Sequence, residues 1–404
     1  MSLIVQKFGG SSVANAERVF HVAKIITDTY KLGNDVIVVV SAQGDTTDDL
    51  IKKANEINPD ASKRELDMLL SAGEQMSVSL LAMAIEKLGF PVVSLLGWQA
   101  GFVTSSAYGT ARIKDIIPHR IKKEIDKKNI VIVAGFQGLN KYDDITTFGR
   151  GGSDTSAVAI AAVMHADICK IYTDVEGVYT ADPRYVANAR KLDAISYDEM
   201  LELATLGAQV LNNRSVEMAK KYNIELEVLS SMVNVPGTIV KEKVKMEKML
   251  INGVAKDDNV ARVSIVSVPD RPGLAFKIFS KLSANDVNVD IILQSIGRNN
   301  TKDISFTIQR DDLKKTLKIL NDYIDTIGAE KVIFDEGVSK VSIVGAGMES
   351  HPGVAAKMFE ALFDAQINIQ MISTSEIKIS VLIDSNDSNH AVSVIHNKFF
   401  DSQD

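Results

Sequence analysis

Three glycines and Arg150, within Gly149–Gly152, form the stretch of this chain with the clearest chemistry. An apolar strand candidate, Ile130–Ala134, precedes them and a helix candidate rich in Ala and Val follows, so they lie at a strand-to-helix junction. The free N–H groups and the dipole at the start of a helix bind anions, and Arg150 adds a fork that suits a carboxylate or a phosphate. A single loop of this kind has a second interpretation, a mobile loop that Ser153 or Asp154 ends as a helix N-cap.

A second loop of the same kind favours the anion-binding interpretation. Leu3–Phe8 is predicted as a strand, Gly9–Gly10 as a turn, and Ser11–Ser12 as the cap of a helix over Val13–Asp28. Two anion cradles together predict a polyphosphate ligand. Lys7 then lies at the C-terminal end of the first strand, which is where open α/β sheets place their ligands.

The elements that must position these loops alternate between strand and helix. Val36–Val40 is a run of β-branched residues, typical of a strand buried on both faces of a parallel sheet. Glu65–Leu88 is predicted as a helix, in which a break at Gly73 would aim Glu74 into a cleft; the alternative for Glu74 is a solvated helix residue. Ile113–Lys127 is predicted as another helix. The alternation predicts a mostly parallel sheet with helices on both faces.

The last third of the chain contains an internal repeat. Val263–Val266 recurs as Val341–Val344, and Asn288 recurs 80 residues later as Asn368. Such a period indicates a duplicated structural unit, and each copy has the order of a ferredoxin-like βαββαβ unit. The second copy lacks a final strand, and Ile251–Ala255 is the best spare one. We therefore expect the first copy to be inserted within the second.

Composition limits the class of protein. The chain has 404 residues, 45 of them basic and 52 acidic, with a net charge of −7 and no dense basic block, which argues against nucleic acid and an anionic membrane as partners. The one cysteine, Cys169, cannot form an internal disulfide and is expected to be a small buried residue. No basic leader and no apolar run of ~20 residues is present. We expect a cytoplasmic protein of two or three domains.

Several segments resemble the signature motifs of the aspartokinases. These are Lys7–Ser12, Leu70–Glu74 and Phe148–Asp154, and Thr173–Gly177 with Asp182–Arg184 resembles the family's nucleotide-binding stretch. The resemblance covers roughly the first 240 residues, and the remainder is similar to the paired ACT regulatory domains of single-function aspartokinases. It implies an amino-acid kinase domain over residues 1–240, a linker over 241–248, a first ACT domain over 257–336, and a second over 249–256 plus 337–404.

The resemblance implies ATP-dependent phosphorylation of L-aspartate to 4-phospho-L-aspartate, the first step of lysine, threonine and methionine biosynthesis, with Mg²⁺. A carboxylate is already ionised at pH 7, so such a kinase needs no general base. Lys7 would neutralise the transferred phosphoryl group. Asp154 would either hold Lys7 in place or help to organise Mg²⁺, and no dedicated set of metal ligands is expected.

The implied contacts form three groups. The substrate contacts are Ser41, Thr47, Glu74, Arg150, Gly151, Gly152 and Ser153, with Arg150 binding a carboxylate of aspartate and Glu74 its ammonium group. The nucleotide contacts are Lys7, Phe8, Gly9, Gly10, Thr173, Asp174, Tyr179, Arg184 and Gln209. The effector contacts are Asp270, Asn288, Val289, Asp290, Gln294, Asn368, Ile369, Ser375 and Glu376. We expect lysine to be the inhibitor, alone or together with threonine, and we expect a homodimer or dimer of dimers through the ACT domains.

Four residues depart from the family pattern. Gln209 replaces a lysine that would face the nucleotide phosphates, Asn212 and Asn213 replace a His-Pro pair, and Asp45 replaces another lysine. These changes bear on ATP affinity more than on reaction type. Two alternatives remain open: another member of the amino-acid kinase superfamily, and a non-catalytic amino-acid sensor that keeps the fold.

Overall fold

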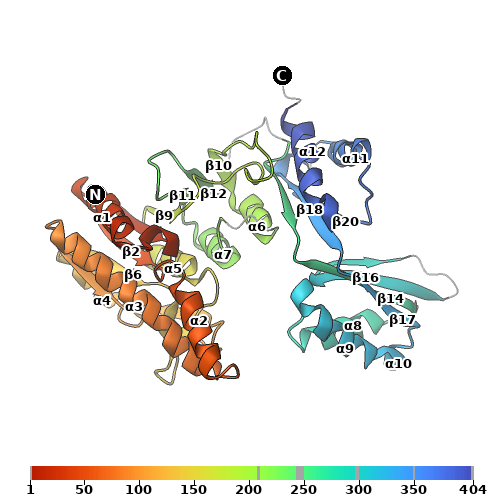
Figure 1. The fold of residues 1–404 in the computed structure, drawn as a ribbon, viewed down its shortest axis with the longest axis horizontal. Helices are drawn as coiled ribbons and strands as arrows, with labels where there is room; N and C mark the ends of the chain where they lie inside the picture. The colour runs from red at the N-terminus through yellow and green to blue at the C-terminus, as the bar shows by residue number, and fades with distance from the viewer. Residues whose placement is uncertain (1, 207–209, 243–249, 296–299, 349–350, 402–404) are drawn as a thin grey trace. The chain divides into compact units, whose positions relative to one another are not determined.

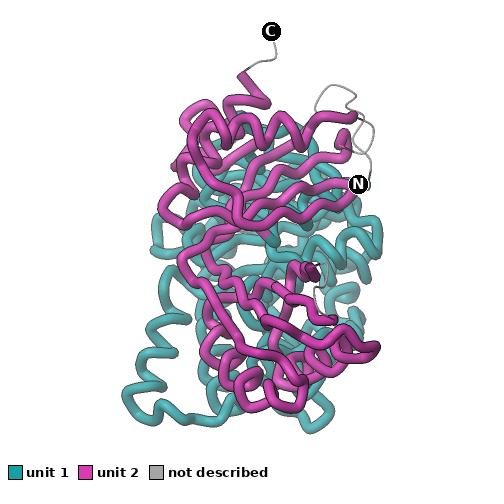
Figure 2. Tube along the Cα trace, turned by 90° about the vertical axis from the view of Figure 1, so that its right-hand side faces the viewer, with its two compact units in different colours: residues 1–179, 190–205, 209–246 teal, residues 180–189, 206–208, 247–404 magenta. Residues whose placement is uncertain are grey.

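The computed structural model describes residues 2–206, 210–242, 250–295, 300–348 and 351–401. The chain forms two compact units, coloured separately in Figure 2, and each is described by itself. Unit 1 comprises residues 1–179, 190–205 and 209–246, and unit 2 comprises residues 180–189, 206–208 and 247–404. The segment 180–189 therefore belongs to unit 2 although both of its chain neighbours belong to unit 1.

Unit 1 is built on an eight-stranded sheet (Figure 1) with the order β10-β12-β11-β9-β1-β2-β6-β3. The strands are β1 Leu3–Phe8, β2 Asp35–Val40, β3 Val92–Leu95, β6 Ile130–Ala134, β9 Ile168–Thr173, β10 Ala194–Ser196, β11 Leu226–Ser230 and β12 Thr238–Lys241. The six strands from β11 to β3 are parallel to one another, and β12 pairs antiparallel with β11. Val36–Val40 is buried throughout, as expected for a strand covered on both faces.

Helices cover both faces of this sheet, which confirms the predicted architecture. The helices are α1 Ala16–Lys31, α2 Thr46–Ile57, α3 Lys63–Lys87, α4 His119–Asp126, α5 Gly152–Met164, α6 Tyr197–Thr205 and α7 Asn213–Tyr222, with a short 3₁₀ turn at Gly10–Val13. One face packs against α1 and α3 through alternate residues of β2, among them Val38. Helix α5, which contacts β1, β2 and β9, packs against α7. Among the described residues, α3 is the one helix long and apolar enough to span a membrane, and 56% of its apolar window is buried in the fold.

The predicted helix over Ile113–Lys127 is wrong in its first half. Residues Ile113–Ile116 form β5, which pairs with β4 (Phe102–Thr104) in a small sheet with β7 (Gln137–Leu139) and β8 (Ile145–Thr147). The helix begins after Pro118, a residue that is unfavourable inside a helix and common at its start. Strand pairing with β4, a tertiary interaction, decides the conformation of the earlier residues.

Unit 2 contains two four-stranded antiparallel sheets, one for each copy of the repeat. The first has the order β15-β16-β14-β17 and the second β13-β18-β20-β19. The elements are β13 Gly253–Asp257, β14 Val260–Pro269, α8 Leu274–Ser283, β15 Val289–Gln294, β16 Thr301–Gln309, α9 Leu313–Asn321, α10 Ile324–Ile327, β17 Lys331–Asp335, β18 Val338–Val344, α11 Val354–Asp364, β19 Met371–Thr374, β20 Lys378–Asp384 and α12 Ser388–Phe400. The βαββαβ class expected for both copies is confirmed.

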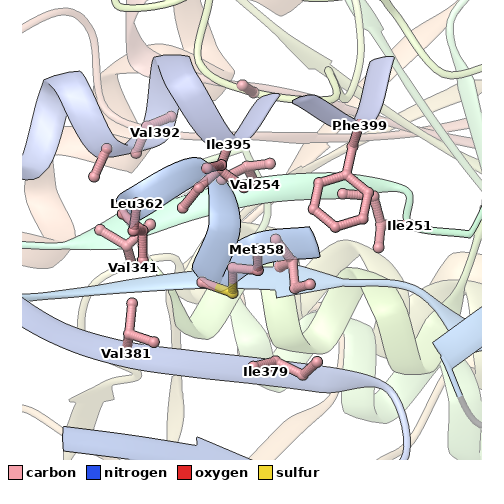
Figure 3. Close-up of a cluster of buried hydrophobic side chains, with 14 of the residues drawn as sticks. Ile251, Val254, Val341, Met358, Leu362, Ile379, Val381, Val392, Ile395 and Phe399 are labelled. Carbon is pink, nitrogen blue, oxygen red and sulfur yellow. The ribbon is translucent and has the colours of Figure 1, made fainter. Parts of the chain in front are cut away.

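Strand β13 takes the place in the second sheet that β17 takes in the first. It pairs antiparallel with β18, from Gly253 opposite Val344 to Asp257 opposite Lys340. The chain then runs through the whole first copy before it returns to β18. Figure 3 shows the core under the second sheet, where Val392, Ile395 and Phe399 of α12 lie over residues of the strands and of α11.

Candidate active site

The predicted site residues of unit 1 gather at one edge of the large sheet. Because β1, β2, β6, β9 and β11 are parallel, their carboxyl ends lie at this edge, where open α/β sheets bind ligands. Gly9 follows β1, Ser41 follows β2 and Asp174 follows β9. Ser41 is tied to the first loop because its N–H donates to the carbonyl of Phe8 at 3.1 Å.

A buried ion pair joins the two glycine loops. Lys7 Nζ, from the end of β1, lies 2.6 Å from Asp154 Oδ1, in the first turn of α5, and the two side chains are only 12% and 11% exposed. A carboxylate is favoured in the first turn of a helix because the helix dipole is positive there. A cation is thus held where the two predicted anion cradles meet.

The first cradle depends on a close approach of two backbones. A Cβ on Gly10 would lie 2.6 Å from the carbonyl oxygen of Ala42, and Gly44 N–H donates to the Gly10 carbonyl at 3.0 Å. The turn after β1 is therefore packed directly on the turn after β2. The ring of Phe8 is fully buried and stacks on Tyr172 at 4.4 Å, so Phe8 can offer a ligand only its backbone.

The second cradle has the left-handed glycines that its sequence suggested. Gly149 and Gly151 have φ values of 77° and 70°, which non-glycine residues adopt only at a cost. The N–H groups of Arg150 and Gly151 donate to no acceptor among the residues that the structure describes. The Arg150 side chain is exposed and forms no ion pair with any of them. Backbone donors and a cation are therefore available to an anion here.

Glu74 is buried with one of its oxygens unsatisfied. Oε1 accepts a hydrogen bond from Ala42 N–H at 3.1 Å, while Oε2 has no partner among the described residues. Burial raises the pKa of Glu74 to about 7. A buried carboxylate in this condition is a site for a cation.

The break predicted at Gly73 does not occur. Helix α3 is continuous over Lys63–Lys87. A Cβ on Gly73 would meet the Ala42 side chain at 2.8 Å and Thr46 Cγ2 at 3.5 Å. The glycine thus lets α3 approach the turn after β2, which brings Glu74 beside Ser41 and the start of α2, where Thr47 lies.

The nucleotide candidates are divided between the units. Thr173 ends β9 and donates a hydrogen bond to Asp174 at 3.1 Å, and half-buried Tyr179 donates to Glu176 at 3.4 Å, all in unit 1. Arg184 lies in unit 2, is exposed, and pairs with Asp182 at 2.6 Å. Gln209 lies outside the described residues.

Three side chains that motif reasoning did not assign to the site contact the second cradle. Asp67, Asn212 and Arg214 form hydrogen bonds to the backbone of residues 147–150. Asp67 lies seven residues before Glu74, on the same face of α3, and an acidic residue at that spacing was the available signal. No local pattern marks Arg214, because its partners lie 66 and 103 residues away.

The effector candidates of unit 2 lie at exposed or half-buried positions. Val289, Asp290 and Gln294 are on β15, directly after Asn288. Asp290 forms a short ion pair with Lys340 of β18, so it connects the two copies, and Asp270 pairs with Lys302 at 2.8 Å. In the second copy, Asn368 and Ile369 precede β19, and Ser375 and Glu376 follow it. Within the described parts of the chain, no three Asp, Glu, His or Cys side chains converge as metal ligands.

Known families and proteins match nearly the whole chain. The amino acid kinase family matches residues 2–230, and the ACT domain matches residues 262–325 and 341–399. The aspartokinase of Mycolicibacterium smegmatis is 51% identical over 99% of this chain and 96% of its own, and that of Geobacillus stearothermophilus is 51% identical over 99% and 97%.

Solved structures give the same result for the fold. Clostridium acetobutylicum aspartate kinase is 25% identical, with a TM-score of 0.79 over 98% of this chain and 100% of its own. Escherichia coli aspartokinase III in complex with aspartate and ADP has a TM-score of 0.85 at 24% identity, again over 98% and 100%.

Proposed function

The chain belongs to the aspartokinase family, and from this premise we propose that it transfers the γ-phosphoryl group of ATP to the side-chain carboxylate of L-aspartate, giving 4-phospho-L-aspartate. That it is an aspartate kinase follows from the family; the atoms involved and the residue roles are our proposal. The Lys7–Asp154 ion pair between two glycine loops is the observation that carries it, since it holds one cation where both reactants need one.

The reaction needs positioning and charge neutralisation more than proton transfer. An oxygen of the ionised aspartate carboxylate attacks the γ-phosphorus, the bond from this phosphorus to the β–γ bridging oxygen breaks, and ADP leaves with the electron pair. No proton has to be removed from the nucleophile. Catalysis then depends on holding the two anions in line and on stabilising the charge that develops between them.

Lys7 is assigned the neutralising role and Asp154 holds its ammonium group in place. The backbone N–H groups near Gly9 and Gly10 lie beside Lys7 at the same sheet edge, which supports a phosphate position there. Mg²⁺ fits this site as an ion that arrives with the nucleotide, because it takes one or two protein carboxylates at most in such sites and Asp154 can supply one. When bound, the metal would add neutralising charge on the phosphates.

The α-carboxylate and the ammonium group of aspartate need opposite charges. Arg150, which forms no ion pair with the described residues, can form two parallel hydrogen bonds to a carboxylate, and Glu74 has one oxygen without a partner among them for the ammonium group. Gly151, Gly152 and Ser153 surround the first position. Ser41 and Thr47 lie near Glu74, where hydroxyl groups would hold the side-chain carboxylate.

The nucleotide is assigned to the neighbouring part of the edge. Thr173 ends β9, next to β1, and Asp174 and Tyr179 follow it. Arg184, in unit 2, is a candidate from the resemblance alone. The bound ADP of Escherichia coli aspartokinase III supports a nucleotide site in this fold. Gln209 remains a candidate from its sequence position.

We assign feedback control to the two ACT domains of unit 2, the first over residues 257–336 and the second over 249–256 plus 337–404, after a kinase domain over 1–240 and a linker over 241–248. The proposed effector is lysine, alone or together with threonine. The complex of Escherichia coli aspartokinase III, 25% identical to this chain, with lysine and aspartate supports lysine. The enzyme would then act at the first step of lysine, threonine and methionine synthesis, in the cytoplasm. A homodimer or dimer of dimers through the ACT domains is the proposed assembly.

Segment 180–189 supplies a physical route for this control. Its Thr180 carbonyl accepts a hydrogen bond from Val254 N–H of β13 at 2.8 Å, and Ala181 and Val186 belong to the apolar core of the second ACT domain. Tyr179 and Arg190, at the two ends of the segment, belong to unit 1. An effector that changed the packing of unit 2 would displace a segment that carries Arg184 and continues directly from Tyr179.

A coupled assay of ADP release with L-aspartate and with L-glutamate tests the proposal. We expect turnover with aspartate and little with glutamate, and a product that hydroxylamine traps as an acyl derivative. Turnover with glutamate alone would favour another member of the amino-acid kinase superfamily. Binding of aspartate by calorimetry without any turnover would favour a sensor.

A further inference from the structure

The backbone of the loop that carries Arg150 is held near its two ends, where Phe148 N–H donates to the Phe136 carbonyl at 2.9 Å and Gly152 N–H donates to the Gly149 carbonyl at 3.0 Å. It runs from the end of β8 at Thr147 to Gly152, and its two left-handed glycines allow many backbone conformations. Arg150 is exposed at its tip. A side chain that must bind a carboxylate through two hydrogen bonds needs a defined backbone beneath it.

Asp67 of α3 fixes the start of the loop. Its carboxylate accepts hydrogen bonds from Thr147 N–H at 2.9 Å, Thr147 Oγ1–H at 2.7 Å and Gly109 N–H at 2.9 Å. Asp67 is 1% exposed, and its pKa is raised because the carboxylate is taken out of water. A buried carboxylate is retained at this cost where its three acceptor bonds order the backbone.

Arg214 and Asn212, at the start of α7, fix the rest of the loop. Arg214 donates from Nη1 to the Phe148 carbonyl at 2.8 Å and from Nη2 to the Ala111 carbonyl at 3.1 Å. Asn212 donates from Nδ2 to the Arg150 carbonyl at 3.1 Å. Its Oδ1 accepts a hydrogen bond from Arg214 N–H as the N-cap of α7, so the orientation of its amide is fixed as well.

We propose that Asp67, Asn212 and Arg214 are positioning residues that hold the backbone of residues 147–150 so that Arg150 meets the carboxylate of aspartate. None of the three is required to touch the substrate. The inference rests on the proposed role of Arg150. It predicts that the three residues act on the KM for aspartate and have little influence on the KM for ATP, whose candidate contacts follow β1 and β9.

Asn212→Ser is the sharpest test because it separates the two contacts of Asn212. Serine is also a good N-cap, so the start of α7 is kept, but its short side chain cannot reach the Arg150 carbonyl. We expect the KM for aspartate to rise about three- to tenfold, the value for one lost hydrogen bond, with the KM for ATP and the melting temperature nearly unchanged. Asn15→Ser is the matched control, since Asn15 caps α1 through Arg18 N–H at 3.0 Å and has no contact with the loop; it should leave both KM values unchanged.

A pair of substitutions at Asp67 gives an independent measurement. Asp67→Ala removes all three acceptor bonds and should raise the KM for aspartate. In Asp67→Asn the amide oxygen can accept both N–H bonds while the NH₂ group donates to Thr147 Oγ1, so we expect it to restore most of the affinity. If Asp67→Ala fails to fold, Asn212→Ser alone decides.

Arg150→Lys distinguishes the failure of this inference from the failure of the proposed function. It should raise the KM for aspartate more than tenfold, because a point charge cannot replace two parallel hydrogen bonds. If it has no effect on that KM, the proposed role of Arg150 is wrong and the inference fails with it. Suppose instead that Arg150→Lys raises the KM for aspartate, while Asn212→Ser and Asp67→Ala either change neither KM or change both KM values equally. Then only the positioning role is overturned.

Discussion

The charged side chains proposed to act at the reaction centre of unit 1 are buried apart from that of Arg150, whereas those proposed to bind the effector in unit 2 are exposed. The side chains of Lys7 and Asp154 are 12% and 11% exposed, but those of Asp270 and Asp290 are 57% and 39% exposed. Burial makes an electrostatic interaction strong and the loss of a partner costly. Exposure makes the same interaction weak and easily reversed. This difference suits a fixed reaction centre in one unit and reversible binding of a metabolite in the other.

The comparison therefore predicts that equal chemical changes have unequal effects in the two units. Removing a charge from the reaction centre of unit 1 should change kcat or KM by one or more orders of magnitude. Removing a charge from the effector positions should change only the response to an amino acid, and by less. Five predictions sharpen this comparison, beginning with the largest expected effect.

Lys7→Ala should lower kcat by roughly 10²–10³-fold, because one lost electrostatic contact to a developing charge has this effect. The KM for aspartate should change little, and the melting temperature should fall, because Asp154 loses its partner in a buried ion pair. Lys31→Ala is the matched control, since Lys31 pairs with Asp28 at 2.9 Å on the exposed surface of α1. If Lys7→Ala keeps more than about a third of the activity, the loss is far below that of one electrostatic contact, and Lys7 does not belong to the reaction centre.

Glu74 should make aspartate binding depend on pH near neutrality. Its pKa is raised to about 7 by burial, and only the ionised form attracts the substrate ammonium group. Below this pKa, the KM for aspartate should rise by about tenfold per pH unit as the ionised fraction falls. In Glu74→Gln this dependence should disappear, and the KM at pH 8 should exceed the wild-type value by roughly 10- to 100-fold.

As pH rises, aspartate binding should become stronger, whereas the stability of the ligand-free protein should fall. A carboxyl whose pKa is raised in the folded state binds more protons when folded than when unfolded, so its ionisation lowers stability as pH rises from about 4.5 to 7. Glu74→Gln should therefore melt at a higher temperature than wild type at pH 8 and at a similar temperature at pH 5. A variant that melts lower at pH 8 would show that Oε2 has a stabilising partner in the ligand-free protein.

How far the sequence predicts the site depends on whether its contacts are local. The glycine turns, Lys7 and Asp154 lie in continuous motifs at strand ends, and one parallel sheet brings their ends together. The insertion of the first repeat within the second could also be predicted, because the second copy lacks a final strand and Ile251–Ala255 is a strand without a place in the first copy. Arg214 could not be predicted as a site residue, and the only signal for Asp67 was its spacing from Glu74, because their partners in the Arg150 loop lie 66 and 80 residues away in sequence.

The errors have the same origin. The residues Ile113–Ile116 have a helical pattern, yet they pair with β4 as a strand. Gly73 suggested a helix break, but its missing side chain instead lets α3 lie close to Ala42. Tertiary packing likewise places Ala181 and Val186, whose segment lies between parts of unit 1 in sequence, in the core of unit 2. In each case a tertiary contact overrides the local signal.

Gln209→Lys should strengthen ATP binding moderately. The family's lysine is absent at this position, and a cation near phosphate contributes about 1 kcal/mol even in a water-like environment, or about fivefold in affinity. Calorimetry with a non-hydrolysable ATP analogue measures this. Gln366→Lys is the matched control, because it adds the same charge at an exposed position of unit 2. Unchanged affinity in Gln209→Lys would mean that another residue has taken over this role.

The last prediction concerns unit 2, where Asp290 and Glu376 are the carboxylates proposed to receive the side-chain ammonium group of lysine. Asp290 already pairs with Lys340, which is 4% exposed and also lies 3.7 Å from Asp257. Asp290→Ala would leave a buried cation short of a partner, so Asp290→Asn, which still accepts a hydrogen bond from Lys340, is the better variant. Glu376 forms no ion pair with the described residues, and Glu376→Ala tests the site directly.

We expect either variant to raise the inhibition constant for lysine by about fivefold, the value of one partly exposed charge-assisted hydrogen bond. Glu336→Ala, another exposed acidic residue of unit 2, should leave that constant unchanged. The assay measures aspartate phosphorylation with lysine and threonine, separately and together. Absence of inhibition by either amino acid at millimolar levels contradicts the proposed control, because a built effector site must be linked to the substrate through opposite preferences for two states. If both variants stay fully sensitive to lysine, feedback inhibition still holds, but other carboxylates bind the ammonium group of lysine. The contrast between a buried reaction centre and an exposed effector site would then no longer rest on Asp290 and Glu376.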